Sequence, residues 1–146
     1  MYKISVPTIA NTCVQRDRDE IIRQFKEFDA DMAILSIGSY QFDEKKLEET
    51  LENFKTNAEY FRKEGMEVGT WMWTFLVPPH TTYVRPVTLH GNVRDCSACP
   101  TDKDFVKFAC DYIKKVAAAG PAFILLDDDF RSDVRMTSLT VSARII

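Results

Sequence analysis

Strand-like and helix-like segments alternate along this 146-residue chain, and the alternation constrains the fold more than any other feature. Short runs rich in β-branched and aromatic residues predict strands at residues 3–9, 32–37, 66–75 and 122–126. Between them, apolar residues recur every three or four positions, as on one face of an amphipathic helix. The order β-α-β-α-β-α-β predicts an α/β protein with a parallel sheet and right-handed crossovers.

The ends of the three predicted helices carry residues that favour helix starts and stops. Short polar side chains cap the free backbone amides of a first turn, and glycine commonly follows a last turn. The expected starts are Asp17 or Asp19, Asp43, and Thr101 with Asp104, and the expected stops are Gly65 and Gly120.

Two architectures satisfy this order. A flavodoxin-like open sheet needs a phosphate-binding loop after its first strand, but residues 7–18 contain no glycine. We therefore favour half of a TIM-type (β/α)8 barrel, whose complete form takes about 200 residues or more. The partial barrel is expected over residues 1–131. Residues 132–146 lack the next amphipathic helix and are expected to form an irregular tail, as in a truncated chain.

Composition excludes several classes of protein. The chain is 45% hydrophobic and 28% charged, with a net charge of −3 and no basic block, which argues against nucleic-acid binding. No apolar run approaches the ~18 residues of a membrane span. The first residues indicate a strand rather than a secretory signal. We expect a cytoplasmic protein whose four cysteines are free thiols.

The fourth predicted strand runs directly into three carboxylates, Asp127, Asp128 and Asp129. Such a strand end is where barrels carry their catalytic groups, and two neighbouring carboxylates can divide into a general acid and an ionised partner. Arg131 is placed to pair with one of them. The alternative is a solvated strand end that caps a following helix.

Aromatic residues in the third strand are candidates for binding a ligand. Trp71, Trp73 and Phe75 alternate with other residues and so point to one side of the strand. An indole near the strand end can stack on the apolar face of a sugar, and Trp73 and Phe75, which are nearest that end, are the better ligand candidates. The alternative is that these side chains simply fill the sheet core.

A long segment at residues 76–100 separates the third strand from the third helix and contains both histidines and two cysteines. Loops longer than about 12–15 residues are usually functional or disordered. His90 is a candidate substrate contact. Cys96 and Cys99 have zinc-knuckle spacing but lack a second close pair of ligands, so they are weak metal candidates and an ordinary loop is preferred.

Four motifs together resemble the N-terminal half of glycoside hydrolase-like (β/α)8-barrel proteins. They are Ile4-Ser5-Val6-Pro7, Gly69-Thr70-Trp71-Met72-Trp73-Thr74, Cys96-Ser97-Ala98-Cys99-Pro100-Thr101 and Leu126-Asp127-Asp128-Asp129-Phe130-Arg131. The resemblance implies a carbohydrate-active barrel without a cofactor, in which the acidic cluster serves in acid–base chemistry or substrate contact.

Hydrolysis also needs a second carboxylate about 5–9.5 Å away, which in such barrels comes from later strands. The chain is therefore expected to be a fragment that carries part of a sugar-binding and acid–base site and is inactive alone. The alternative is a non-catalytic α/β module that binds an unknown ligand or associates with itself through open sheet edges.

Overall fold

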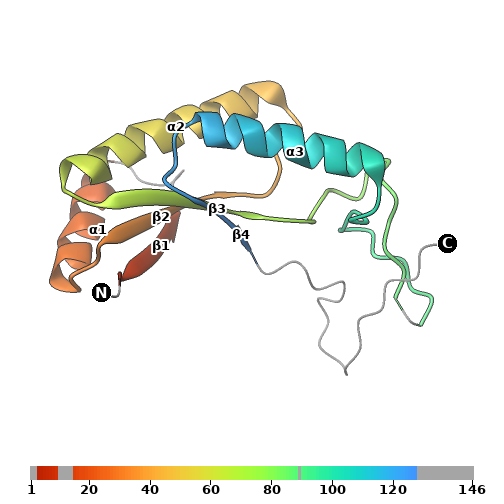
Figure 1. Ribbon diagram of the computed structural model, residues 1–146, viewed down its shortest axis with the longest axis horizontal. Coiled ribbons are helices and arrows are strands. Elements are labelled where there is room, and N and C mark those ends of the chain that lie inside the picture. Colours follow the sequence, from red (N-terminus) through yellow and green to blue (C-terminus); the bar gives the residue numbers. More distant parts are fainter. Residues whose placement is uncertain (1–2, 10–14, 89, 128–146) are drawn as a thin grey trace.

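The computed structural model describes residues 3–9, 15–88 and 90–127 (Figure 1). Strands and helices alternate as the sequence predicts, and the predicted tail at 132–146 lies outside the described residues. The elements are β1 (Ser5–Ile9), α1 (Gln15–Glu27), β2 (Met32–Gly38), α2 (Glu44–Lys63), β3 (Glu67–Trp73), α3 (Lys103–Ala118) and β4 (Ile124–Asp127). In this part of the chain no helix is long and apolar enough to span a membrane.

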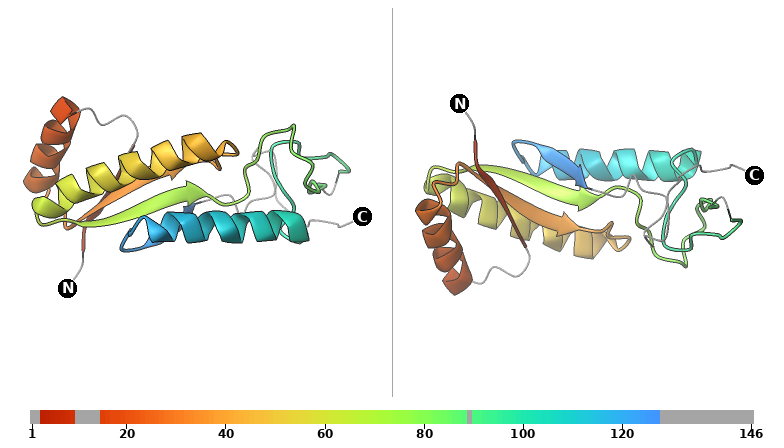
Figure 2. Two further views of the ribbon diagram at one scale, coloured as in Figure 1. Left: turned by 90° about the horizontal axis from the view of Figure 1, so that it is seen from above. Right: turned by 90° about the horizontal axis from the view of Figure 1, so that it is seen from below.

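The four strands form one sheet in the order β1-β2-β3-β4, and every neighbouring pair is parallel. Helices α2 and α3 lie side by side over one face of this sheet (Figures 1 and 2). Helix α1 adds Ile22 and Phe25 to the same core, where Phe25 meets Phe61 of α2 with ring centroids 5.7 Å apart. Helices α2 and α3 therefore bury one face of the sheet, while α1 packs against α2 at one end of it (Figure 2).

The strand order and the position of α2 and α3 over one face are consistent with four consecutive strands of a (β/α)8 barrel and with another open α/β sheet. The described sheet differs from a flavodoxin-like sheet, whose strand order is 2-1-3-4-5 and whose helices cover both faces. The predicted α/β class and parallel sheet are confirmed. Because the described sheet is open, β1 and β4 are its two edge strands.

Two helix starts differ from the sequence prediction. Helix α1 begins at Gln15, so Asp17 and Asp19 lie within its first turns and do not precede it. Helix α3 is capped by Asp102 instead of Thr101. The Asp102 carboxylate accepts hydrogen bonds from the first-turn amides and also from the amide of Val84 in the preceding loop. That tertiary contact selects Asp102, and these hydrogen bonds lower its pKa.

Other helix ends follow the prediction. Asp43 caps α2 by accepting hydrogen bonds from the amides of Lys45 and Lys46. Gly65 follows this helix with a φ of 86°, a conformation that glycine adopts without steric cost. Helix α3 ends at Ala118, shortly before Gly120.

The face of the sheet away from the helices pairs small residues with large ones. In β3, Val68, Thr70 and Met72 point into the helix-covered core, so Gly69, Trp71 and Trp73 belong to the other face. The Phe123 ring, from the residue before β4, lies directly against Gly69. A Cβ atom at Gly69 would come within 2.2 Å of that ring.

A second pair on this face also places a small residue beside a large one. Ser36 of β2 is in register with Trp71 of β3, so a small side chain again lies beside a large one. Alternation of small and large side chains across neighbouring strands is how barrel interiors are filled. On the uncovered face, small and large side chains of neighbouring strands therefore lie side by side.

The close approach of Phe123 makes Gly69→Ala a direct test of this packing. The new methyl group must displace the ring, so we expect the free energy of unfolding to fall by about 1–3 kcal/mol, measured by urea denaturation. In a Phe123→Ala background the same change should cost much less, because the clash is gone. Equal costs in both backgrounds would contradict the packing described.

Candidate functional site

Two of the predicted site residues, Trp71 and Trp73, lie near the carboxyl end of β3, on the face that α2 and α3 leave uncovered. Register pairs Trp71 with Leu125 and Trp73 with Asp127. Residues paired in this way on parallel strands occupy the same face of a sheet. The backbone position of the first predicted catalytic aspartate is therefore next to Trp73, on the tryptophan face.

The two indoles form one wall of this face. Trp71 and Trp73 are both half-buried, so each keeps some surface accessible to solvent. Their ring centroids are 6.3 Å apart and their planes are tilted by 59°. Exposed apolar surface continues onto β4, where Leu125 is 46% exposed. A half-buried aromatic wall beside a polar strand end can hold a ligand with an apolar face and polar edges.

The remaining acidic residues stay predictions. Asp128, Asp129 and Arg131 lie outside the described residues, and for Asp127 only the backbone position in β4 is described. The carboxyl ends of β1, β2 and β3 close with Ile9, Gly38 and Trp73, none of which carries a carboxylate. A second acid facing the first is thus absent from the other described strand ends.

Phe75 does not join the tryptophans as the alternation predicted. Strand β3 ends at Trp73, so the period of two does not extend to residue 75. The Phe75 ring instead packs against Phe105 of α3, with centroids 6.1 Å apart, at the margin of the helix-covered core. The expected alignment of Phe75 with the two tryptophans is therefore wrong, and its role as a ligand contact stays a prediction.

The long segment after β3 is an ordered structure closed by an arginine. One guanidinium nitrogen of Arg85 donates to the carbonyl oxygens of Pro78 and Thr81 at 3.0 and 2.8 Å, and to the Thr81 hydroxyl at 2.7 Å. The other nitrogen donates to the carbonyl oxygen of Ser97 at 3.2 Å. Arg85 therefore ties the two ends of the loop together, a role that sequence reasoning missed because most of these acceptors are backbone carbonyl oxygens, which have no sequence signature.

The same segment contains the two cysteines that are weak metal candidates. The carbonyl of Cys96 accepts from the amide of Val77, and the amide of Cys99 donates to the carbonyl of Val84. Cys96 is half-buried and Cys99 is buried, and both are free thiols. In the described part of the chain, no three His, Cys, Asp or Glu side chains gather as a metal site. His90 is exposed, and its role as a substrate contact stays a prediction.

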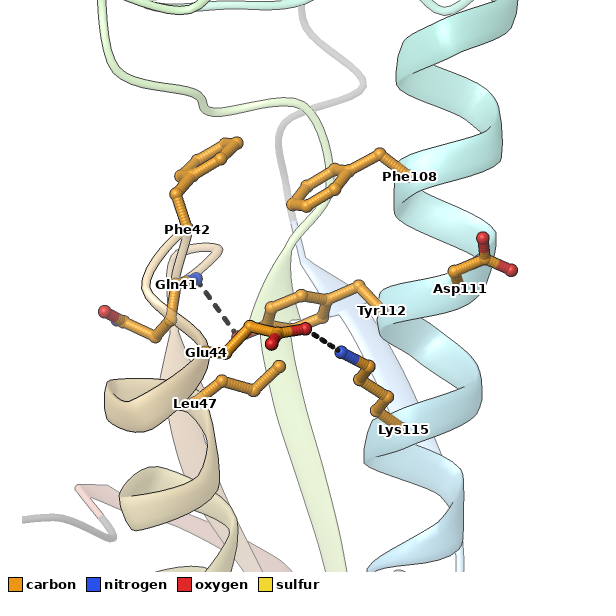
Figure 3. Close-up of a pocket in the computed structure, with 8 residues that line it drawn as sticks. All are labelled: Gln41, Phe42, Glu44, Leu47, Phe108, Asp111, Tyr112 and Lys115. Carbon is orange, nitrogen blue, oxygen red and sulfur yellow. Dashed lines mark hydrogen bonds and ion pairs between the residues drawn. The ribbon is translucent and has the colours of Figure 1, made fainter.

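A second hollow lies on the helix side, between the start of α2 and the middle of α3 (Figure 3). Its volume is about 210 Å³ and its apolar walls include Phe42, Leu47 and Phe108. The rings of Phe42 and Phe108 are stacked with centroids 4.9 Å apart. Glu44 and Lys115 form an ion pair across it at 3.2 Å.

Two buried tyrosines, Tyr40 and Tyr112, hold the loop after β2, and Tyr112 also lines this hollow. The Tyr40 hydroxyl donates to the carbonyl oxygen of Thr74 at 2.9 Å, and the Tyr112 hydroxyl accepts from the amide of Gln41. Burial raises the pKa of Tyr40 to about 12 and raises the pKa of Tyr112. Both phenols therefore stay neutral near pH 7.

Comparison with known proteins adds no assignment to these features. No family model, no curated protein and no solved structure matches this chain.

Replacing Arg85 tests whether it holds the loop. In Arg85→Ala the carbonyl groups lose their shared donor, and we expect local stability to fall by about 2 kcal/mol. Hydrogen exchange of the loop amides of Val77, Ala98 and Cys99 should then accelerate roughly 30-fold. Lys103→Ala, at an exposed position just beyond the loop, is the matched control and should leave these rates unchanged. Unchanged rates in Arg85→Ala would contradict its role.

Proposed function

We propose that this chain carries part of a sugar-binding and acid–base site of a glycoside hydrolase-like barrel. The observation that supports this most is the register of Trp73 with Asp127 on the uncovered face. An aromatic ring beside a carboxylate offers a sugar both stacking for its apolar face and hydrogen bonds for its hydroxyl groups. The resemblance of the strand motifs to such barrels points in the same direction.

The proposal assigns separate roles to the residues. Trp73 and Trp71 stack on the sugar, and Asp127, Asp128 and Asp129 together act as acid, base or hydroxyl ligand. Arg131 keeps one carboxylate ionised, and His90 contacts the substrate. No cofactor is needed. Because the other described strand ends lack a facing carboxylate, the chain binds sugar without hydrolysing glycosides by itself.

Sugar binding is tested with an array of immobilised glycans and the Trp73→Ala variant. Removing the indole should weaken binding about 2- to 12-fold, which corresponds to the 0.5–1.5 kcal/mol of an aromatic contact. Phe42→Ala is the matched control, since this exposed aromatic lies in the hollow on the helix side. Equal sugar binding by both variants would contradict the proposal that the tryptophan face binds the sugar.

A second candidate function is self-association through an open sheet edge. Strand β4 exposes Leu125 and Leu126 at 46% and 36%. The β1 edge is less suited. The amide and carbonyl of Ile4 point toward the start of β2. The backbone N–H and C=O groups of successive residues point alternately to the two sides of a strand, so the backbone of Pro7, three residues after Ile4, faces the free edge. The Pro7 nitrogen has no hydrogen to donate to a partner strand there. A partner would therefore pair with β4.

Light scattering of the purified chain tests this candidate. Edge pairing predicts a dimer that Leu126→Lys converts to a monomer, because an edge lysine opposes strand addition. Val106→Lys replaces another exposed apolar residue, on α3, and should leave the dimer intact. A monomeric parent chain would exclude association through β4.

A further inference from the structure

The hollow between α2 and α3 combines apolar walls with a pair of opposite charges (Figure 3). Its apolar part includes the side chains of Phe42, Leu47 and Phe108. The carboxylate of Glu44 and the ammonium group of Lys115 meet beside these walls, with 3.2 Å between nitrogen and oxygen. Because α2 and α3 cover one face of the sheet, the hollow lies on the opposite side of the sheet from the two tryptophans.

The ion pair has bonding capacity left for a ligand. Lys115 donates one hydrogen bond, to Oε1 of Glu44, although an ammonium group has three hydrogens. Within the described residues, the second carboxylate oxygen of Glu44 accepts no hydrogen bond. The side chains of Glu44 and Lys115 are 86% and 52% exposed, and such surface pairs contribute little free energy. A ligand can therefore add to this pair, or open it, at small cost.

The third charged side chain that lines the hollow is already engaged elsewhere. Asp111 accepts from Lys107 and Lys114 at 3.2 and 3.1 Å, and its carboxylate points away from the other lining side chains (Figure 3). The hollow thus presents one anion, Glu44, next to one cation, Lys115. This pattern is complementary to a zwitterion that carries an ammonium group and a carboxylate on neighbouring atoms.

The apolar walls indicate which side chain the zwitterion carries. The volume of about 210 Å³ is below the roughly 300–1,000 Å³ of pockets for drug-sized ligands, so the ligand is small. Phe42 and Phe108 stack with their planes 7° apart, and Phe42 is 38% exposed, so ring surface is accessible. Aromatic rings attract one another in offset and edge-to-face contacts beyond the gain from area burial. One aromatic ring beside the two charges suits these walls best.

We propose that this hollow binds a free aromatic amino acid. The ligand's ammonium group pairs with Glu44, its carboxylate pairs with Lys115, and its ring packs against Phe42 and Phe108. A residue inside a peptide chain carries neither backbone charge, which is why the ligand is the free amino acid. The proposal concerns the helix side of the sheet and is independent of the proposed sugar site.

NMR titration of the full chain with phenylalanine, tyrosine and tryptophan tests the proposal. The amide signals of Phe42, Phe108 and Lys115 should shift and saturate in the low millimolar range, as expected of so small a ligand at an exposed site. Phenylpropanoate lacks the ammonium group, phenethylamine lacks the carboxylate and alanine lacks the ring. Each should bind at least about threefold more weakly than phenylalanine. No saturable shift at the hollow with any of the three aromatic amino acids overturns the proposal, as does a one-charge analogue that binds as tightly as phenylalanine.

Charge variants separate the two polar contacts. In Glu44→Gln the advantage of phenylalanine over phenylpropanoate should disappear, while its advantage over phenethylamine remains. Lys115→Gln should do the reverse. The matched controls are Glu52→Gln and Lys55→Gln, which remove an exposed ion pair of α2 that does not line this hollow, and both advantages should survive them. All four side chains are exposed, so the substitutions leave the core intact. Advantages that persist in both Glu44→Gln and Lys115→Gln overturn the proposal.

Discussion

The parallel pairing of β2 with β3 is the interaction on which the rest of the structure depends. Its register sets Leu35 beside Thr70, whose buried hydroxyl donates to the Leu35 carbonyl at 2.6 Å. On one face this pairing aligns the core residues that receive α2 and α3. On the other face it sets Ser36 beside Trp71. A slip of one residue would exchange the two faces, and the helices would then meet tryptophans instead of the core.

The two faces of the sheet differ in burial and in the residues that they expose. The helix-covered face holds the large side chains that are almost fully buried, such as Phe54, Phe61 and Phe105, and supplies most of the hydrophobic stabilisation. The uncovered face carries two half-buried indoles next to β4, whose last residue is Asp127. The loop closed by Arg85 borders the carboxyl ends of the strands, where parallel α/β proteins place their ligands.

Much of this could be predicted from local patterns. The strands and helices were predicted from strand-like runs that alternate with apolar residues at helical spacing. Asp43 and Gly65 were predicted as the ends of α2 because helix capping depends on residues a few positions apart. Thr101 failed as a cap because the choice between Thr101 and Asp102 depends on a contact with Val84, far away along the loop. Phe75 failed because the strand period ends at Trp73. The role of Arg85 was missed since its acceptors are backbone carbonyls, which have no sequence signature.

The sequence by itself determined the α/β class, the parallel sheet and the residues that can carry chemistry, because hydrophobic periodicity and residue type are local properties. Tertiary structure decided which of these residues meet. The register of β3 with β4 brought position 127 beside Trp73, and the absence of a side chain at Gly69 let Phe123 close one end of that face. Such contacts join residues more than fifty positions apart, and no short-range pattern specifies them.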